Sequence, residues 1–407
     1  MAEYAQMRDS GVPWIQSIPE AWSVRVLFQL ADQVKNKNKD LLEKNLLSLS
    51  YGRIKRKDIN NPEGLLPESF DGYNIIEAND IVLRLTDLQN DHTSLRVGQS
   101  AERGIITSAY TTIRPSALVN PQYLYYVLHA YDLIKGFYGM GAGVRQGLNY
   151  DEVKTIKVPF PSLPEQASVV AYLDGQVGQI DSIIAEALAS IEEYKQWKSS
   201  AIFEATTKGI SRDVEMRDSR VEWIGRIPKG WKIASLKHLC SMQAGKNLTA
   251  EQILENGKYP VYGGNGIRGY YHQYNNEGSY ILVGRQGALC GNAHLVEGQF
   301  WATEHAVVTT NKPGVDLAYL YFMLIAMNLN QYASNAAAQP GLSVNVIQNI
   351  KTVFPPLSEQ RNIAKHLNER CSQIDSLIEE KKALVYDLET YKRSLIYEIV
   401  TGKRKVV

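Results

Sequence analysis

The sequence predicts an α+β protein made of two mixed α/β domains, each followed by a long helix, with an internal repeat. Three observations lead to this prediction: two long stretches with helical periodicity, a repeated segment ahead of each domain, and strand-like middles that each end in an aromatic helix. Because the repeated parts flank unlike middles, the pattern indicates a fixed frame that holds two different surfaces.

The first long helix is predicted within residues 160–209. Pro161 and Pro164 end the preceding segment, and the following run contains no proline. Its apolar positions step by three and four, which makes one seam on a helix: Val170, Leu173, Val177, Ile180, Ile184, Ala187, Ile191, Tyr194, Lys198, Ala201 and Ala205. At about 1.5 Å per residue this helix is roughly 65 Å long, and so narrow a seam requires a partner helix.

The partner is predicted in the same chain, within residues 354–402. Gln179-Ile180-Asp181-Ser182 recurs 194 residues later as Gln373-Ile374-Asp375-Ser376. The seam continues at this offset through Ala364, Leu367, Cys371, Ile374, Ile378, Lys381, Val385, Leu388, Lys392, Leu395 and Ile399. Lysines interrupt it at positions 198, 381 and 392, and Leu377, Leu384 and Ile396 are expected to widen the apolar face. Acidic residues of the first helix (Glu186, Glu192, Glu193) and basic ones of the second (Lys381, Lys382, Lys392, Arg393) predict complementary flanking charges.

Composition narrows the class of protein. The chain has 407 residues, 44% of them hydrophobic, and a net charge of +1, which counts against a nonspecific nucleic-acid coat but leaves room for local basic patches. No segment has the length and apolar character of a membrane span or the pattern of a signal peptide. The three cysteines are too widely spaced for the pattern of a disulfide framework or a zinc site, so a reducing cytoplasm is the expected location.

The head segments repeat at a second offset. Residues 9–27 return as residues 218–236, with Trp14 and Trp22 matched by Trp223 and Trp231. The middles differ, although both contain short strand-like runs, at 80–85 and 104–113 in the first copy and 279–285 and 305–310 in the second. Aromatic helices are expected at 121–134 and 316–327.

No catalytic or metal-binding residues are predicted. The Asn-Pro-Gln-Tyr run at 120–123 is near the Asn-Pro-Pro-Tyr of amino-methyltransferases, but glutamine replaces a proline and no glycine-rich cofactor turn follows a strand. Asp151 to Lys154 could be mistaken for nuclease ligands, yet the second copy has Asn345 to Gln348 there. The glycine pairs near 264 and 287 do not have phosphate-loop spacing, and the histidines do not have metal spacing.

The repeated frame resembles the specificity subunits of type I restriction–modification enzymes. The resemblance rests on the Trp-Ile-x-x-Ile-Pro-x-x-Trp heads, Phe-Pro-x-Leu-x-Glu-Gln at each helix start, Gln-Ile-Asp-Ser within each helix and Thr-x-Gly or Thr-Gly at its end, and it covers nearly the whole chain. It implies two target recognition domains at residues 1–159 and 210–353. It also implies antiparallel spacer helices at 160–209 and 354–407, the latter with a C-terminal tail, in a pseudo-twofold arrangement.

The resemblance also implies the function and the partners. Each recognition domain would read one half of a gapped, asymmetric site in double-stranded DNA, and the helices would set the gap. Two modification subunits, which bind S-adenosylmethionine and methylate adenine at N6, would dock on the helices. Restriction subunits that use ATP and Mg would join them, and this chain would hold no cofactor and perform no catalysis.

Candidate DNA-contacting residues are the polar, basic and aromatic side chains of the unlike middles, because base edges favour amides, hydroxyls and arginine, and phosphates favour arginine and lysine. In the first domain they are Tyr51, Arg53, Lys55, Arg56, Lys57, Arg84, Thr86, Gln89, Asn90, Arg96, Tyr110, Arg145 and Gln146. In the second domain they are Lys246, Asn247, Asn265, Arg268, Tyr270, Tyr271, Arg285, Gln286, His305 and Gln339. The alternative for each is a solvated loop side chain, and for Arg268 the glycines around it are expected to allow close approach to a ligand.

Two further expectations concern the scaffold. Helix faces outside the seam are expected to carry the modification-subunit contacts, whereas Glu165, Gln166, Glu359 and Gln360 are interpreted as N-terminal dipole partners. The alternative function is a non-catalytic protein-interaction scaffold that reads no DNA sequence. A self-sufficient methyltransferase is opposed by the missing cofactor loop.

Overall fold

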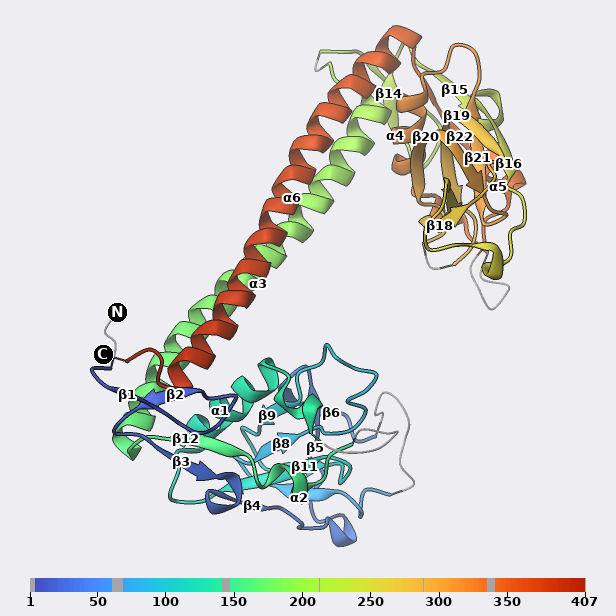
Figure 1. Ribbon diagram of the computed structural model, residues 1–407. Helices are drawn as coiled ribbons and strands as arrows, with labels where there is room; N and C mark the ends of the chain where they lie inside the picture. Colours follow the sequence, from blue (N-terminus) through green and yellow to red (C-terminus); the bar gives the residue numbers. More distant parts are fainter. Residues whose placement is uncertain are drawn as a thin grey trace. The chain divides into compact units, whose positions relative to one another are not determined.

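The protein has a mixed α/β architecture with two long helices. The computed structural model describes residues 4–60, 69–140, 147–211, 213–287, 289–334 and 341–406. The chain divides into two compact units: unit 1 is Met1–Ala187 with Ala383–Val407, and unit 2 is Leu188–Lys382. Helices α3 (Leu163–Lys208) and α6 (Leu357–Val400) each contribute one end to each unit (Figure 1). The mixed α/β fold with two long helices is as predicted, and the predicted domain boundaries stay a prediction.

Unit 1 contains two small sheets and two strand pairs among its described residues. The sheets have the orders β6-β5-β10-β7 and β4-β11-β8-β9, and the pairs are β1-β2 and β12-β3. The strands are β1 (Met7–Asp9), β2 (Ser17–Pro19), β3 (Ser23–Val26), β4 (Ala31–Gln33), β5 (Leu46–Ser50), β6 (Arg53–Lys57), β7 (Asn74–Ile76), β8 (Ile81–Leu83), β9 (Val97–Gln99), β10 (Gly104–Ile106), β11 (Thr111–Pro115) and β12 (Lys157–Phe160). The predicted strand at 80–85 corresponds to β8. The run at 104–113 divides into β10 and β11, because Tyr110 N–H bonds Thr107 O (3.2 Å) in a turn.

The predicted aromatic helix of unit 1 is α1 (Pro121–Leu133). It begins where the Asn120 side chain accepts hydrogen bonds from the N–H groups of Gln122 and Tyr123, with Pro121 at the first helical position. Leu124, Leu128 and their neighbours on α1 lie in the main core of the unit. The remaining helical segments of this unit are α2 (Tyr150–Val153), η1 (Leu27–Gln29), η2 (Lys39–Leu41) and η3 (Gly136–Gly139).

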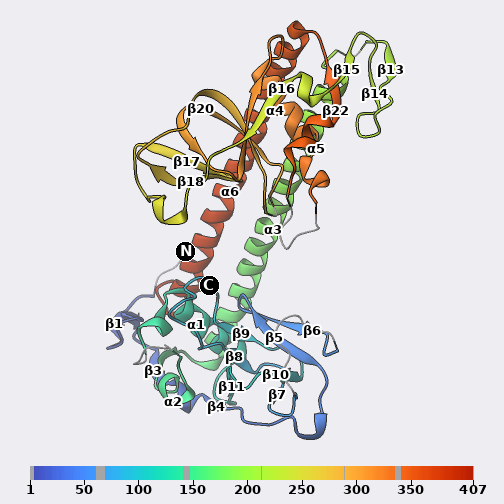
Figure 2. The ribbon, with the colours of Figure 1, turned by 90° about the vertical axis from the view of Figure 1, so that its right-hand side faces the viewer.

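Unit 2 is built on one six-stranded sheet with the order β16-β21-β19-β20-β17-β18. Its strands are β13 (Met216–Asp218), β14 (Arg226–Pro228), β15 (Lys232–Ser235), β16 (Cys240–Ala244), β17 (Tyr259–Gly263), β18 (Gly266–Tyr271), β19 (Asn276–Gly284), β20 (Ala293–Ala302), β21 (Ala306–Asn311) and β22 (Lys351–Phe354). The helical segments are α4 (Leu317–Ala326), α5 (Val344–Asn349), η4 (Leu236–His238), η5 (Ala250–Gln252) and η6 (Leu329–Tyr332). Figure 2 shows α4 beside the sheet, and its buried Tyr319, Leu320 and Met323 join the core. The predicted strands at 279–285 and 305–310 and the helix at 316–327 are confirmed.

The predicted seam is covered in each unit. The core of unit 1 contains Leu173 and Ile180 of α3 together with Leu395 and Ile399 of α6. The core of unit 2 contains residues from the other ends of the helices, among them Ile202, Ala205, Leu367 and Cys371. Every predicted seam position is buried or half-buried. The expected widening is only partly correct, because Ile396 is buried but Leu377 and Leu384 are exposed.

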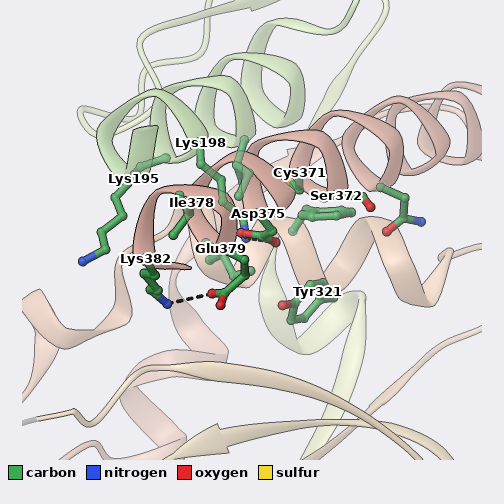
Figure 3. A pocket seen from close by; sticks show the side chains of 14 residues that line it. Lys195, Lys198, Tyr321, Cys371, Ser372, Asp375, Ile378, Glu379 and Lys382 are labelled. Atoms are coloured by element: carbon green, nitrogen blue, oxygen red, sulfur yellow. Dashed lines mark hydrogen bonds and ion pairs between the residues drawn. The ribbon is translucent and has the colours of Figure 1, made fainter. Parts of the chain in front are cut away.

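Two lysines of the seam form ion pairs with aspartates of the other long helix. In unit 1, Lys392 Nζ lies 2.6 Å from Asp181 Oδ1. In unit 2, Lys198 Nζ lies 2.6 Å from Asp375 Oδ2, and Figure 3 shows these side chains on facing helices. Both aspartates belong to the repeated Gln-Ile-Asp-Ser. The expected flanking charge pattern is corrected for Lys382, which pairs with Glu379 of its own helix (2.7 Å).

Two glutamines at the helix starts have a structural role that the dipole interpretation did not foresee. Gln166 is fully buried; its Oε1 accepts from Asn120 N–H (2.8 Å) and its amide donates to Pro161 O (2.9 Å). Gln360 is also fully buried and makes the same two kinds of bond, with Asp316 N–H (2.8 Å) and Pro355 O (2.9 Å). Each glutamine therefore joins the start of a long helix to the start of the aromatic helix in its unit. The adjacent glutamates accept bonds from side chains, Glu165 from Tyr4 O–H and Glu359 from Trp231 Nε1–H, both at 2.7 Å.

Replacing Gln360 by leucine should destabilise unit 2. The substitution leaves the Asp316 N–H and the Pro355 carbonyl without their partner, and a buried unsatisfied polar group costs about 1–3 kcal/mol. The measurement is thermal or denaturant unfolding of Gln360→Leu beside Gln373→Leu, a control at an exposed glutamine of the same helix. Equal losses in the two variants would contradict the assigned role.

Candidate nucleic-acid interface

Four segments of unit 2 meet at one end of the sheet and form a loop cluster, defined by residues 245–247, 263–266, 284–287 and 303–305. Backbone hydrogen bonds connect them: Arg285 N–H donates to His305 O (2.9 Å), and Gly245 N–H donates to Ala306 O (2.9 Å). Thr303 N–H donates to Tyr262 O (2.9 Å). The loop ends of four separate strands are thus held as one surface.

Glycines permit this close packing. A Cβ on Gly284 would lie 2.0 Å from Gly264 O, and one on Gly245 would lie 2.3 Å from Thr303 O. A Cβ on Gly263 would lie 2.4 Å from Cδ of Arg268.

The glycines expected to allow close approach of a ligand near Arg268 are those of the 264–270 loop. A Cβ on Gly269 would lie 2.6 Å from Leu254 O, so this glycine makes room for the chain's own backbone, whereas Gly266 has open space at its Cβ position. The expectation stays a prediction for Gly264 and Gly266.

The loop cluster brings together most of the residues predicted in the second domain. It contains Lys246, Asn247, Asn265 and Gln286, which are exposed, and Arg285 and His305, which are half-buried. Arg268, Tyr270 and Tyr271 lie on β18, which leaves the cluster at Gly266; Arg268 is exposed and the two tyrosines are half-buried. Gln339 lies outside the described residues. The cluster therefore presents amides and cations, the groups that read base edges and hold phosphates.

One member of this surface was not found from the sequence. Asn292 donates from Nδ2 to Asn265 Oδ1 (3.0 Å) and so orients that amide. The two asparagines are 27 residues apart, so no local pattern connects them. His305 Nε2 likewise lies 3.2 Å from Oε1 of the neighbouring Glu304.

The basic run of the first domain forms the edge strand β6. A two-residue turn of Tyr51 and Gly52, both with positive φ, joins it to β5, and the Tyr51 ring is 75% exposed. Arg53 pairs with Asp181 of α3 (3.2 Å), and Arg56 pairs with Glu102. These two arginines are therefore already held by carboxylates far along the chain, which the sequence could not indicate. Lys55 and Lys57 are also exposed on this strand, where charged residues equally serve to block edge-to-edge pairing.

The structure corrects the prediction for Arg96. Its side chain is fully buried, and the guanidinium donates to three backbone carbonyls, those of Thr86 (2.8 Å), Asp87 (3.3 Å) and Asp91. Its Nε also donates to Tyr138 O–H (3.2 Å). Arg96 therefore organises the 86–91 loop from inside and does not face a DNA surface.

The loop that Arg96 holds carries other predicted residues outward. Gln89 and Asn90 are exposed, and Arg84 and Thr86 are half-buried. Tyr110 is half-buried and packs against a small core cluster that includes Leu49. Arg145 and Gln146 lie outside the described residues.

A buried carboxyl beside Arg96 gives a pH-dependent contribution to stability. Asp132 is fully buried and its Oδ2 accepts from Arg96 N–H (2.5 Å), while burial raises the pKa of its carboxyl to about 6. Between the ordinary value of 3.8 and that value, the folded protein holds a proton that the unfolded chain releases. The stability from this group is therefore present at low pH and is lost as the pH rises through about 6.

Asp132→Asn should remove this dependence. Relative to the variant, the wild type should gain thermal stability as the pH falls from about 7 to about 4. Burial lowers the pKa of nearby His129 to about 4 and acts in the opposite direction, but it is present in both proteins and cancels in the difference. The measurement is the unfolding temperature of both proteins across this range, and a constant difference between them would contradict the prediction.

Metal-binding clusters and membrane-spanning helices are absent from the described ranges. Within them, no group of three His, Cys, Asp or Glu side chains is placed to hold a metal ion. Among the helices of those same ranges, none is both long and apolar enough to cross a membrane. The three cysteines are buried and free.

Comparison with known proteins shows which family this chain resembles. Residues 228–385, which include the whole loop cluster, match the family model of the type I restriction modification DNA specificity domain. The chain is 44% identical over 152 residues to the type I restriction enzyme EcoprrI specificity subunit of Escherichia coli, an alignment that covers 36% of this chain and only 38% of that protein. It is 23% identical over 397 residues to the MjaVIII specificity subunit of Methanocaldococcus jannaschii, covering 90% of this chain and 88% of the relative.

A solved structure supports the fold over nearly the whole chain. A chain from a structural study of complex assembly and conformational transition in the type I R-M system superposes with a TM-score of 0.69 at 13% identity, covering 94% of this chain and 98% of that one. The resemblance noted in the sequence is confirmed: the chain is similar to type I restriction–modification specificity subunits.

Proposed function

We propose that this chain is the DNA specificity subunit of a type I restriction–modification complex and is itself non-catalytic. The observation that carries the proposal is the match of residues 228–385 to a DNA specificity domain, because that range includes the whole loop cluster with its exposed amides and cations. Amides and arginines on a rigid loop surface are suited to reading base edges in a DNA groove.

Each unit reads one half of a gapped, asymmetric site in this proposal. The two surfaces differ, since unit 1 offers the β6 hairpin and the 86–91 loop while unit 2 offers the loop cluster. Two different surfaces predict two different half-site sequences. Phosphate contacts by the lysines would fix the register of each unit on the duplex.

The long helices would form the antiparallel, pseudo-twofold scaffold that sets the gap and docks two modification subunits. Matched contacts in the two units support this: Trp14 Nε1–H donates to Lys157 O and Trp223 Nε1–H donates to Lys351 O, both at 3.0 Å. The paired lysines 392 and 198, each bonded to an aspartate of the other helix, support it too.

The chemistry belongs to the partners in this proposal. The modification subunits bind S-adenosylmethionine and methylate adenine at N6, and the restriction subunits use ATP and Mg. This chain holds no cofactor and works in the cytoplasm, where the DNA is.

Mapping methylated adenines tests the proposal directly. We expect that co-expression of this chain with its modification subunit in a host lacking other adenine methylation yields one gapped, asymmetric motif methylated on both strands. A complex that forms without any methylation would instead favour a protein-interaction scaffold. An ungapped or palindromic motif would contradict the assignment of two reading units.

Arg268→Ala and Arg285→Ala together should weaken recognition of one half-site only. An arginine that contacts a base edge contributes about 1–3 kcal/mol to the preference for the correct base, and the alanine substitutions remove this contribution. The measurement is duplex binding with substitutions in each half-site, with thermal unfolding as the control for folding. Unchanged binding would remove both arginines from the interface.

Insertion of about seven residues, roughly two helical turns, into α6 should change the gap in the methylated motif and leave both half-sites as they were. The physical reason is that each residue added to a helix lengthens it by about 1.5 Å, whereas a residue added to a flexible linker fixes no distance. Motif mapping of the variant checks this expectation, and altered half-site sequences would refute the spacer role.

A further inference from the structure

A cationic hollow in unit 2 lies apart from the loop cluster. It has a volume of about 510 Å³ and is formed by the 217–221 turn, strand β15, the end of η4 and the start of β22. Its polar lining consists of Arg217, Arg220, His238, Lys351, Ser219 and Ser235. No carboxylate is among its described lining residues. A hollow of this size is in the range of ligand sites.

Arg217 is a fixed positive charge at this hollow. Its guanidinium donates to the carbonyls of Trp231 (2.6 Å), Asp218 (3.3 Å) and Lys229 (3.4 Å). These acceptors are neutral, so they position the arginine without compensating its charge. Two of its five N–H donors are left for a ligand.

Arg220 holds a conformation that arginine rarely adopts. Its φ is +58°, in the left-handed region, and the corresponding residue of the first head segment is Gly11 with φ +65°. An arginine therefore stands where glycine is the unstrained choice, and such backbone strain concentrates at functional sites. The carboxylate of Asp218 bonds the Arg220 backbone N–H (2.9 Å), and the Arg220 side chain is exposed.

Three other positions distinguish this hollow from the same place in unit 1. Ser235 and His238 stand where the first head segment continues with Val26 and Gln29. In the opposite direction, Ala234 replaces Arg25. The changes thus add a hydroxyl and an imidazole and exchange the guanidinium of Arg25 for one on the turn, at Arg220, while the frame contacts of Trp14 and Trp223 stay alike.

We propose that this hollow is a phosphate-binding site. Two arginines, a lysine and the Ser235 hydroxyl supply groups that can donate to phosphate oxygens, whereas the Ser219 hydroxyl already donates to Val221 O (3.2 Å). Guanidinium geometry matches phosphate in particular. The phosphate can come from the backbone of a bound duplex or from a free phosphate or nucleotide. The site does not depend on the proposed function, because nothing in its argument uses the loop cluster.

The first experiment uses the whole chain and inorganic phosphate, with binding followed by calorimetry or ³¹P NMR in a phosphate-free buffer. Arg220→Gly with Lys351→Ala should weaken phosphate binding roughly tenfold, since two charge-assisted contacts are lost. Lys229→Ala is the matched control, because Lys229 is an exposed lysine near the same turn that pairs with Glu215 (2.8 Å) and does not line the hollow. Arg220→Gly alone should leave the unfolding temperature unchanged or higher, since glycine relieves the positive φ.

The second experiment identifies the source of the phosphate. The same double variant is compared with wild type for duplex DNA binding over a range of salt concentrations. A salt slope reduced by about two assigns the site to the DNA backbone, whereas phosphate binding lost with an unchanged slope assigns it to a free phosphate or nucleotide. Two results overturn the proposal: equal phosphate affinity and equal slope in wild type and variant, or binding of an acidic peptide, but not phosphate, that depends on Arg220.

Discussion

Burial of a narrow apolar seam on two helices of 46 and 44 residues is the constraint on which both units depend. Neither helix can bury this seam alone. In unit 1 the start of α3 and the end of α6 bury it, and in unit 2 the end of α3 and the start of α6 do so. The lysines in the seam are compatible with burial because an aspartate of the other helix receives each amine. Since these side chains are partly exposed, the ion pairs add little free energy and instead favour one register of the helices over others.

The buried glutamines extend this constraint from the helices to the domains. A long helix that is anchored only through its seam could slide or rotate by small amounts. Gln166 and Gln360 bond a backbone N–H at the start of α1 or α4 and a proline carbonyl just before their own helix, which fixes that start in three dimensions. Each unit is thereby attached to the long helices through hydrogen bonds of defined geometry.

The sequence was sufficient for the parts of the fold that depend on periodicity and capping. The seam, α1, α4 and strands β8, β19 and β21 follow from local patterns, because the residues that define them are neighbours in the chain. The partners of individual side chains were not predictable in this way. Arg53 and Arg96 looked alike as arginines among turn-forming residues, yet one pairs with a helix carboxylate and the other is buried among backbone carbonyls. Which of these happens is decided by segments far away in the sequence.

The same distinction explains how one frame can carry two unlike surfaces. A Gly-Leu pair occurs in both units, as Gly147-Leu148 and Gly341-Leu342. In each unit a backbone bond joins this pair to the strand end beside the variable loops, from Leu148 N–H to Leu85 O (2.9 Å) and from Leu342 N–H to Arg285 O (2.8 Å). Backbone groups make this bond, so it places no demand on the side chain at position 85 or 285, which is leucine in one unit and arginine in the other. Loop side chains beyond the bond can therefore change without loss of the frame. Attachments of this kind suit a protein whose two surfaces differ while its scaffold stays constant. The backbone hydrogen bond positions the loop, and the side chain at that position can vary.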